Sequence, residues 1–293
     1  MYRILRCIPL IAVSLVFAGG SGTADLLVLS SPGFPSMTML GPAGSAIGSG
    51  SGSILSNPAL CETGFSVAGG RWNLETTAAS VAGAFSIGSD IEAGVGLVYL
   101  GRGGLIGRDE SGAVTGEYSY STGCAMAGVS FPLAGWIEAG VSAGLSWENV
   151  ASSGGTGITA NAGMAFKPSG EFLAGIVLTG VGQAPSWQGI RKDMPTEISA
   201  GASYRISSIL TGFAGGKIGF WTSDAFGCGM SINYREYGCS IGYQYSPGEE
   251  EISGFFAGLR YTYESSGSYT IEIATEQRTE LDWPVLAGLS VSL

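Results

Sequence analysis

The chain has 293 residues, of which 23 are acidic and 13 are basic, giving a formal net charge of −10 at pH 7, and it contains no histidine. The acidity excludes nucleic acid as a partner, because binding its phosphates requires Lys and Arg. The lack of histidine removes Ser-His-Asp and Cys-His catalysis and the HExxH zinc motif, so we expect no enzyme, no catalytic residue, no metal site and no cofactor.

Residues 1–24 have the pattern of a secretory signal peptide. Arg3 and Arg6 precede an apolar run from Cys7 to Phe17, and small residues follow up to Ala24. No later stretch offers the roughly 20 consecutive apolar residues that a membrane-spanning helix needs. We therefore expect an exported chain that is a membrane protein only if it crosses the bilayer with strands.

Residues 25–63 are rich in glycine and serine and fit neither a stable helix nor a regular strand. The tripeptide Asn57-Pro58-Ala59 stands near the end of this segment, and Asn and Pro are good turn formers. A plain linker is the simplest interpretation of the segment from these residues alone.

From Gly64 onward, apolar residues alternate with small or polar ones, as half-buried strands do. Fourteen such segments can be counted, at about residues 64–72, 75–87, 91–100, 119–131, 136–147, 157–167, 171–182, 195–206, 209–221, 226–235, 237–246, 252–263, 268–276 and 281–293. Most have close to the roughly 9–11 residues that a tilted strand needs to cross a bilayer, and a single-chain bacterial barrel requires an even number of strands.

We therefore expect an all-β fold, a closed antiparallel transmembrane β-barrel of fourteen strands over residues 64–293. Short connections largely alternate with long ones such as residues 101–118, 148–156 and 182–194, as turns and loops do in outer-membrane barrels. The alternative is a secreted soluble β-sandwich. Charged residues make up only 12% of the chain, against about 25% in ordinary soluble domains, which disfavours that alternative.

The inward face of the predicted strands is made mostly of Gly, Ser, Ala and Thr. Repeated glycine implies that something approaches the wall closely or that the wall is strongly curved. A few polar side chains share this face and are candidate contacts for a ligand or for an internal segment: Glu92, Glu138, Asn161, Glu197, Arg205, Lys217, Arg260 and Glu272. Opposite charges paired across the lumen would be an equally simple reading.

Four cysteines remain after the signal peptide is removed. Cys228 and Cys239 fall on consecutive predicted strands and on the same face. A disulfide between them is an alternative to two free thiols, and sequence alone does not supply the geometry that a disulfide requires.

The residues Leu40-Gly41-Pro42-Ala43, Ala46-Ile47-Gly48 and Asn57-Pro58-Ala59-Leu60, followed by fourteen amphipathic strands, resemble PorV/PorQ-type outer-membrane proteins of the long-chain fatty-acid transporter (FadL) superfamily. This resemblance implies that residues 25–63 fold inside the barrel as a hatch, with Asn57-Pro58-Ala59 at its turn. It also implies location in the bacterial outer membrane, in contact with its lipid.

Two functional hypotheses follow from this resemblance. The first is a plugged barrel that carries hydrophobic solutes, as in a transporter of fatty acids or other hydrophobic small molecules. The second is a partner-binding or shuttle subunit of a type IX-like secretion apparatus, whose contacts with secretion proteins would come from a long loop. The candidate loop residues are Pro185, Trp187, Ile190 and Arg191, because aromatic and Arg side chains commonly anchor protein interfaces.

Overall fold

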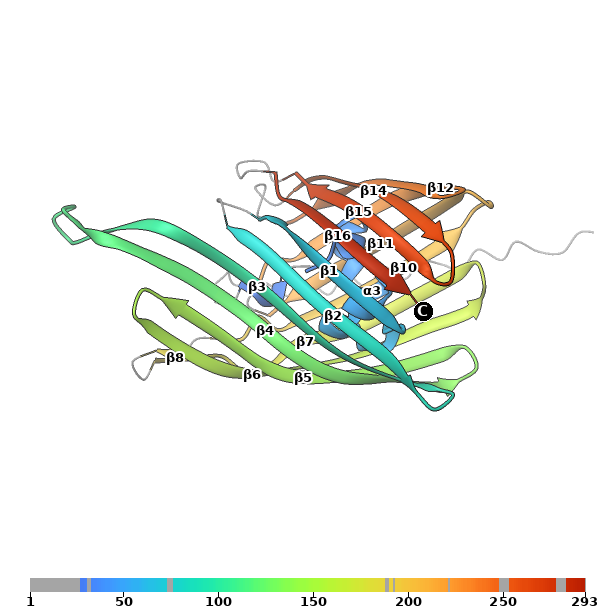
Figure 1. Ribbon diagram of the computed structural model, residues 1–293, viewed down its shortest axis with the longest axis horizontal. Coiled ribbons are helices and arrows are strands. Elements are labelled where there is room, and N and C mark those ends of the chain that lie inside the picture. The colour runs from blue at the N-terminus through green and yellow to red at the C-terminus, as the bar shows by residue number, and fades with distance from the viewer. Residues whose placement is uncertain are drawn as a thin grey trace, which may run out of the picture.

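The computed structural model describes residues 27–30, 33–72, 76–187, 190–191, 193–220, 222–247, 253–277 and 283–292. Within these residues, fourteen antiparallel strands form one closed barrel, in which β1 pairs with both β2 and β16 (Figure 1). The barrel strands are β1 (Gly64–Arg71), β2 (Thr77–Ile87), β3 (Ile91–Arg108), β4 (Val114–Ala134), β5 (Ile137–Val150), β6 (Ser153–Ser169), β7 (Phe172–Gln183), β10 (Glu197–Arg205), β11 (Leu210–Gly219), β12 (Ala225–Tyr234), β13 (Tyr237–Tyr245), β14 (Gly254–Glu264), β15 (Ser268–Glu276) and β16 (Val285–Ser292).

This closed sheet confirms the expected fold class and makes the β-sandwich alternative wrong. Large apolar side chains point outward, and Val95, Leu145 and Ile241 are each close to 60% exposed at 58%, 58% and 59%. A soluble sandwich would bury such side chains between two sheets. The apolar layer here lies on the outside of the molecule.

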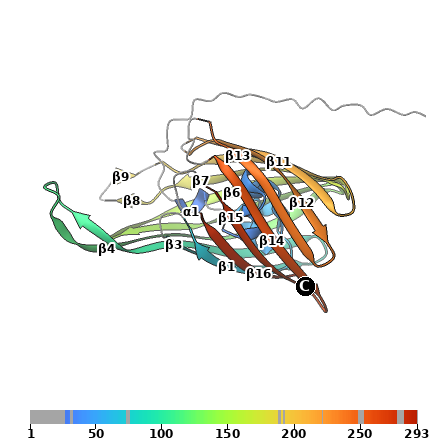
Figure 2. The ribbon, with the colours of Figure 1, turned by 90° about the horizontal axis from the view of Figure 1, so that it is seen from above.

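Strands β3 to β6 are longer than the sequence pattern predicted. The expected loops at residues 101–118 and 148–156 are continuations of paired strands, so the β3–β4 hairpin projects beyond the rest of the barrel (Figures 1 and 2). A register shift between Arg102 and Leu105 interrupts the alternation there. Gly104 lies within it at φ 68°, a conformation that glycine adopts without strain. Because this bulge interrupts the alternation of apolar and polar residues, the sequence pattern did not predict the second half of the strand.

The tip of the β3–β4 hairpin is fixed by Asp109. Its Oδ1 accepts hydrogen bonds from the Ser111 hydroxyl at 2.6 Å and from the Ser111 and Ala113 amides at 2.9 and 3.0 Å. These hydrogen bonds, the Ser111 hydroxyl first, hold the pKa of the Asp109 carboxyl below its ordinary value. The hydrogen bonds that Asp109 accepts within the turn therefore explain why an acidic residue stands at this position.

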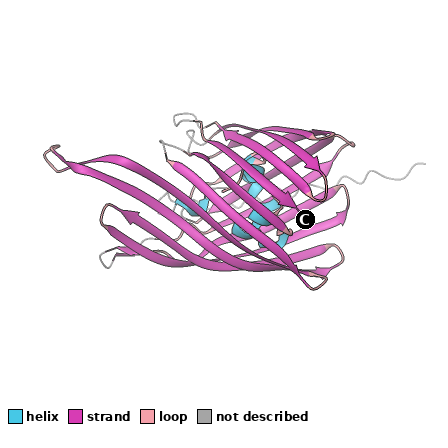
Figure 3. Cartoon of the chain, in the orientation of Figure 1, coloured by secondary structure: helices cyan, strands magenta, loops and turns pink. Residues whose placement is uncertain are grey.

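Within the described residues, six short helical turns lie in the lumen (Figure 3). They are α1 (Leu27–Ser30), α2 (Pro35–Thr38), η1 (Gly41–Ala43), α3 (Gly44–Ile47), η2 (Ser51–Leu55) and η3 (Pro58–Leu60). We call residues 25–63 the hatch segment. Its described turns together touch every barrel strand: η2 and η3 contact β1 to β6, α3 and η1 contact β7 to β13, and α2 contacts β14 to β16. The plain-linker interpretation is therefore wrong, and the described part of the segment is an internal plug.

The two cysteines on neighbouring strands are not bonded. Cys228 lies opposite Tyr243, and Cys239 lies opposite Ile232, so the two thiols are four residues out of register. Both are free and exposed on the outer face. This offset rules out the cross-strand disulfide, because such a bond requires nearly opposed Cβ atoms.

Candidate functional site

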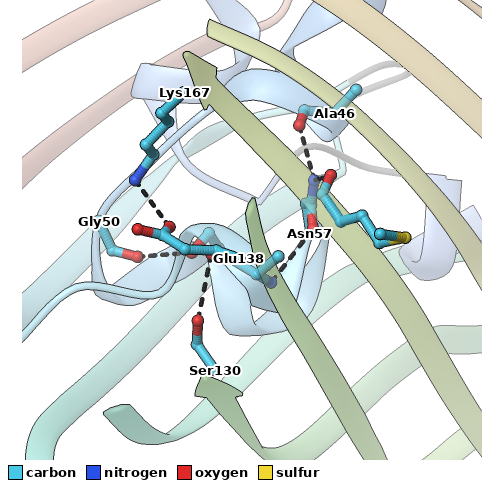
Figure 4. A network of polar contacts seen from close by, with 9 residues as sticks. Ala46, Gly50, Asn57, Ser130, Glu138 and Lys167 are labelled. Atoms are coloured by element: carbon cyan, nitrogen blue, oxygen red, sulfur yellow. Dashed lines mark hydrogen bonds and ion pairs between the residues drawn. The ribbon is translucent and has the colours of Figure 1, made fainter. Parts of the chain in front are cut away.

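The Asn57-Pro58-Ala59 turn joins the hatch segment to the barrel wall (Figure 4). Asn57 is fully buried. Its Nδ2 donates to the carbonyl oxygens of Ala46 at 2.7 Å and Met164 at 3.4 Å, and its Oδ1 accepts from the Ala59 amide at 3.2 Å. Pro58 fits the first position of η3, where no amide hydrogen is needed. One side chain thus connects three stretches of backbone.

Glycines on the wall make room for this turn. A Cβ at Gly140 would overlap the backbone of Pro58 and Ala59, and one at Gly163 would overlap the Asn57 side chain. A Cβ at Gly175 would overlap the carbonyl of Ala46. Hatch residues also lie close to wall glycines on other strands around the barrel. These glycines are Gly94, Gly96, Gly201, Gly215, Gly227, Gly258 and Gly288. The abundance of inward glycine therefore matches the shape of the plug.

Three further hydrogen bonds hold the hatch segment against β1, β4 and β6. Ser130 Oγ donates to the Ala59 carbonyl at 3.1 Å, and Asn161 Nδ2 donates to the Leu55 carbonyl at 3.1 Å. The hydroxyls of Ser51 and Ser66 lie 2.8 Å apart. Hydrogen bonding of buried polar groups is the condition under which they stabilise a packed interface.

Replacing Asn57 with Ala is expected to loosen the hatch segment without breaking the barrel. The change leaves the Ala46 carbonyl and the Ala59 amide buried without their partner, at a cost of about 1–3 kcal/mol for each group. Hydrogen exchange of the amides of residues 44–60 should accelerate, whereas strand amides should not change. The exposed Asn233, changed to Ala, is the control. Unaltered protection of the hatch amides in Asn57→Ala would show that Asn57 does not hold this turn.

A cavity of about 100 Å³, which we call the cavity above the hatch segment, lies between residues 33–56 of that segment and the end of the barrel that carries the long connections. One side of it is apolar, formed by Val28 and Leu29 of the hatch segment and by Val98, Cys124 and Met126 of β3 and β4. Met37, Thr38 and Pro42 contribute from below. Small-molecule sites are mostly apolar cavities with a few placed polar groups, and this cavity has that composition.

The opposite side of the cavity is polar. Lys217 Nζ lies 3.2 Å from Glu197 Oε1, with side-chain exposures of 23% and 6%, and the Thr222 hydroxyl donates to the same carboxylate oxygen at 2.7 Å. Next to this pair, Gln244 Nε2 donates to Glu276 Oε1 at 2.5 Å, and both residues are buried. These side chains stand at the ends of β10, β11, β13 and β15 nearest the long connections.

Two hydroxyl-lined cavities, of about 220 and 190 Å³, lie on the other side of the hatch segment. Ser36, Ser49 and Arg260 border both of them. Arg260 Nε donates to Glu272 Oε1 at 2.8 Å, so this charge is paired within the wall. The hatch segment therefore separates the cavity above it from two cavities whose linings contain many hydroxyl groups.

The eight predicted lumen residues have different surroundings in the structure. Glu197 and Lys217 line the cavity above the hatch segment, and Asn161 anchors the hatch. Glu138 pairs with Lys167 at 2.7 Å, as Figure 4 shows, and Glu92 accepts from Thr63 and Ser86 at 2.6 Å. Arg260 and Glu272 pair with each other. Arg205 is different, because it is exposed at the end of β10 and makes no ion pair with a described residue.

Sequence reasoning missed Thr179, Gln244 and Glu276, which also line the cavity above the hatch segment. All three follow the inward alternation of their strands. The signal was available, but Gln244 and Glu276 stand at predicted strand ends, where a polar residue is easily read as the start of a loop.

The predicted partner-binding loop is folded back onto the barrel mouth. Pro185 is buried, and Ala184 and Met194 pack around Leu29 of the hatch segment. The backbone of Trp187, Ile190 and Arg191 forms a small hairpin of β8 (Ser186–Trp187) and β9 (Ile190–Arg191); the side chains of these three residues lie outside the described set. Pro185 is thus a packing residue rather than an exposed anchor.

No cluster of three or more His, Cys, Asp or Glu side chains among the described residues could hold a metal ion. None of the helices in that part of the chain has the length and apolar character needed to cross a membrane.

A closed fourteen-strand barrel with an apolar exterior and an occupied lumen is a plugged β-barrel. Its fold is shared by the toluene transporter TbuX of Ralstonia pickettii (13% identity over 88% of this chain and 97% of that one, TM-score 0.63). The monoaromatic hydrocarbon channel CymD is 12% identical over 88% and 96%, with a TM-score of 0.65. The toluene transporter TodX of P. putida is 12% identical over 85% and 96%, with a TM-score of 0.61. No protein-family model and no curated protein sequence matches the chain.

Proposed function

We propose that this protein is an outer-membrane channel for small hydrophobic or amphipathic solutes, closed by its hatch segment. The observation that carries the proposal is the cavity between the hatch segment and the long connections, with Val98 and Met126 on one side and Glu197 and Lys217 on the other. A solute bound there would have entered from the loop end and would still be separated from the opposite end by the hatch segment.

The apolar exterior and the structural neighbours support this proposal. At 11–13% identity the neighbours share the fold, and their names as toluene or hydrocarbon transporters suggest the solute class by analogy. The resemblance of residues 40–60 to the long-chain fatty-acid transporter superfamily points the same way. We propose accordingly that residues 1–24, which lie outside the described part, are a signal peptide, that residues 25–63 are the hatch, and that residues 64–293 are the membrane barrel.

The secretion-subunit hypothesis and the narrower likeness to PorV/PorQ proteins have no supporting observation. The loop residue Pro185 is buried against the barrel, and a packed loop offers less contact surface than an extended one. We therefore favour solute transport over partner binding. A pull-down from native outer membrane that recovered secretion proteins with this chain would support the secretion-subunit hypothesis instead.

Filling the cavity tests the transport proposal. Val98 is inward and 5% exposed, whereas Val95 on the same strand points outward. We expect intact Gram-negative cells that express the wild-type chain to take up radiolabelled toluene faster than cells without it. Val98→Trp should remove most of this gain, and Val95→Trp should keep it. Equal uptake by cells with and without the chain would contradict the proposal.

Membrane location is tested by a charge on the outer face. Ile241 stands at the middle of β13 and is 59% exposed. Ile241→Arg is expected to lower the free energy of unfolding in lipid vesicles by about 2–4 kcal/mol, whereas Ile206→Arg, in the turn after β10, should cost about 0–1 kcal/mol. Urea titrations of the refolded barrel measure both. Equal small effects would place residue 241 in water.

A further inference from the structure

We infer that the cavity above the hatch segment selects small amphipathic solutes whose polar group is a hydrogen-bond donor or a cation, such as an amine, and disfavours carboxylates. This inference rests on the proposed function and specifies its solute. It starts from the division of the cavity into two chemically different sides. Val28, Val98 and Met126 lie on one side, and Glu197, Lys217 and Glu276 lie on the other.

The size of the cavity limits the apolar part of the solute. Its volume is about 100 Å³, which is of the order of the roughly 150 Å³ that accommodates a benzene ring in a protein core. A long acyl chain does not fit within this space. A single ring or a short branched chain fits best, with its apolar body against β3 and β4.

The charges on the polar side limit the head group. The described lining residues include the carboxylates of Glu197 and Glu276 and the ammonium of Lys217, and Glu276 is already engaged by Gln244. Lys217 is engaged by Glu197 at 3.2 Å. A solute carboxylate would have to compete with Glu197 for Lys217. It would also stand near the Glu197 carboxylate, and like charges repel strongly where water is scarce.

An amine or hydroxyl head group is favoured by the same side chains, because it can donate hydrogen bonds to the carboxylates. Carboxylate oxygens accept several hydrogen bonds each, and Glu197 already accepts from Lys217 and Thr222 through one oxygen, Oε1. Hydrogen bonds to a charged group are about twice as strong as neutral ones. The polar side therefore offers acceptors to a donor head group while the apolar side takes the ring.

Three probes of nearly the same size test this inference on the full-length protein in detergent: benzylamine, toluene and benzoate. Isothermal titration calorimetry, with heats of dilution into empty micelles subtracted, measures each affinity. We expect benzylamine to bind about tenfold more tightly than benzoate, as one added charged hydrogen bond would produce, with toluene between them.

Two variants show whether the carboxylates cause the preference. Glu276→Gln should weaken benzylamine several-fold and leave toluene unchanged. Glu197→Gln releases Lys217 from its partner and should strengthen benzoate binding. The exposed Glu264 at the end of β14, changed to Gln, is the control and should alter none of the three affinities. Slower migration of the heated than of the unheated barrel on semi-native gels verifies that each variant is folded.

The outcomes separate this inference from the proposed function. If toluene binds but benzoate binds as tightly as benzylamine, the head-group inference is wrong and the solute channel stands. If neither Glu→Gln change alters the order of affinities, the inference is also wrong. If none of the three probes binds the wild-type protein, the cavity is not a solute site and both proposals fail.

Discussion

Deleting residues 41–55 is expected to turn the closed barrel into an ion-conducting pore. This stretch contains η1, α3 and η2, the turns that lie against β1 to β4 and β7 to β13. A fourteen-strand barrel is wider than its own side chains can fill, since about eight strands already give an interior that side chains just occupy. Here many inward positions are glycine, so the hatch segment supplies most of the matter in the lumen.

Planar bilayer recordings measure this effect directly. The wild-type chain should give small or no conductance steps, and the deletion should give steady steps of the size expected for a water-filled barrel. Barrel assembly should persist, because the strand pairing of β1 with β2 and β16 does not use residues 41–55. Unchanged semi-native gel migration would verify it.

A matched control comes from the β3–β4 hairpin, which projects beyond the barrel (Figure 1). Replacing residues 103–119 with Asn-Gly joins the paired residues Arg102 and Tyr120 by a two-residue hairpin turn and removes a stretch of similar length outside the lumen. Its conductance should stay at the wild-type level. If the hairpin deletion opened the pore as much as the hatch deletion, loss of the plug would not be the cause.

The fold was predictable from sequence because a barrel wall has two chemically different faces. Residues such as Val95 and Gly94 alternate between outside and lumen, and this period-two signal survives without any knowledge of strand partners. The prediction failed where the alternation was interrupted, at the bulge between Arg102 and Leu105. The pattern also left open whether Cys228 and Cys239 are bonded, because register depends on the turn between two strands and not on the face of either one.

The site was predictable only in part. Inward polarity correctly placed Glu197 and Lys217 in the lumen, but not which residues they would meet. The course of the hatch segment decides that, and its glycines and serines carry no periodic pattern from which a path could be read. Arg205 occupies an inward position in the alternation of β10 but is exposed at the barrel rim. Alternation predicts the face to which a side chain points and not how far it lies from the barrel end.

Leucine at Gly175 is expected to unseat the hatch segment and leave the barrel intact. Gly175 lies on β7, and a Cβ there would overlap the carbonyl of Ala46 in α3. Ala46 is fully buried, so its backbone has no free space in which to retreat. Overpacking of this kind costs about 1–3 kcal/mol and occasionally more, and the strain falls on the contact between hatch and wall.

The barrel itself should tolerate the change, because glycine weakens a strand and a larger side chain restores strand propensity. Gly175→Leu should therefore raise conductance and speed hydrogen exchange in residues 44–60 without lowering the free energy of barrel unfolding. Gly83 on β2 is the control. A Cβ there would approach no atom closer than 3.8 Å, so Gly83→Leu should leave both the conductance and the exchange at wild-type values.

A double-mutant cycle with the deletion of residues 41–55 gives the sharpest test, because the deletion removes Ala46. If Gly175→Leu acts by colliding with the hatch segment, it should change the conductance of the full chain and have little further effect on the conductance of the deleted chain. Non-additivity of this kind identifies residues that act on each other. If the leucine instead altered the deleted chain as much as the full one, Gly175 would be needed by the strand, and the fit between wall glycines and hatch segment would not explain its presence.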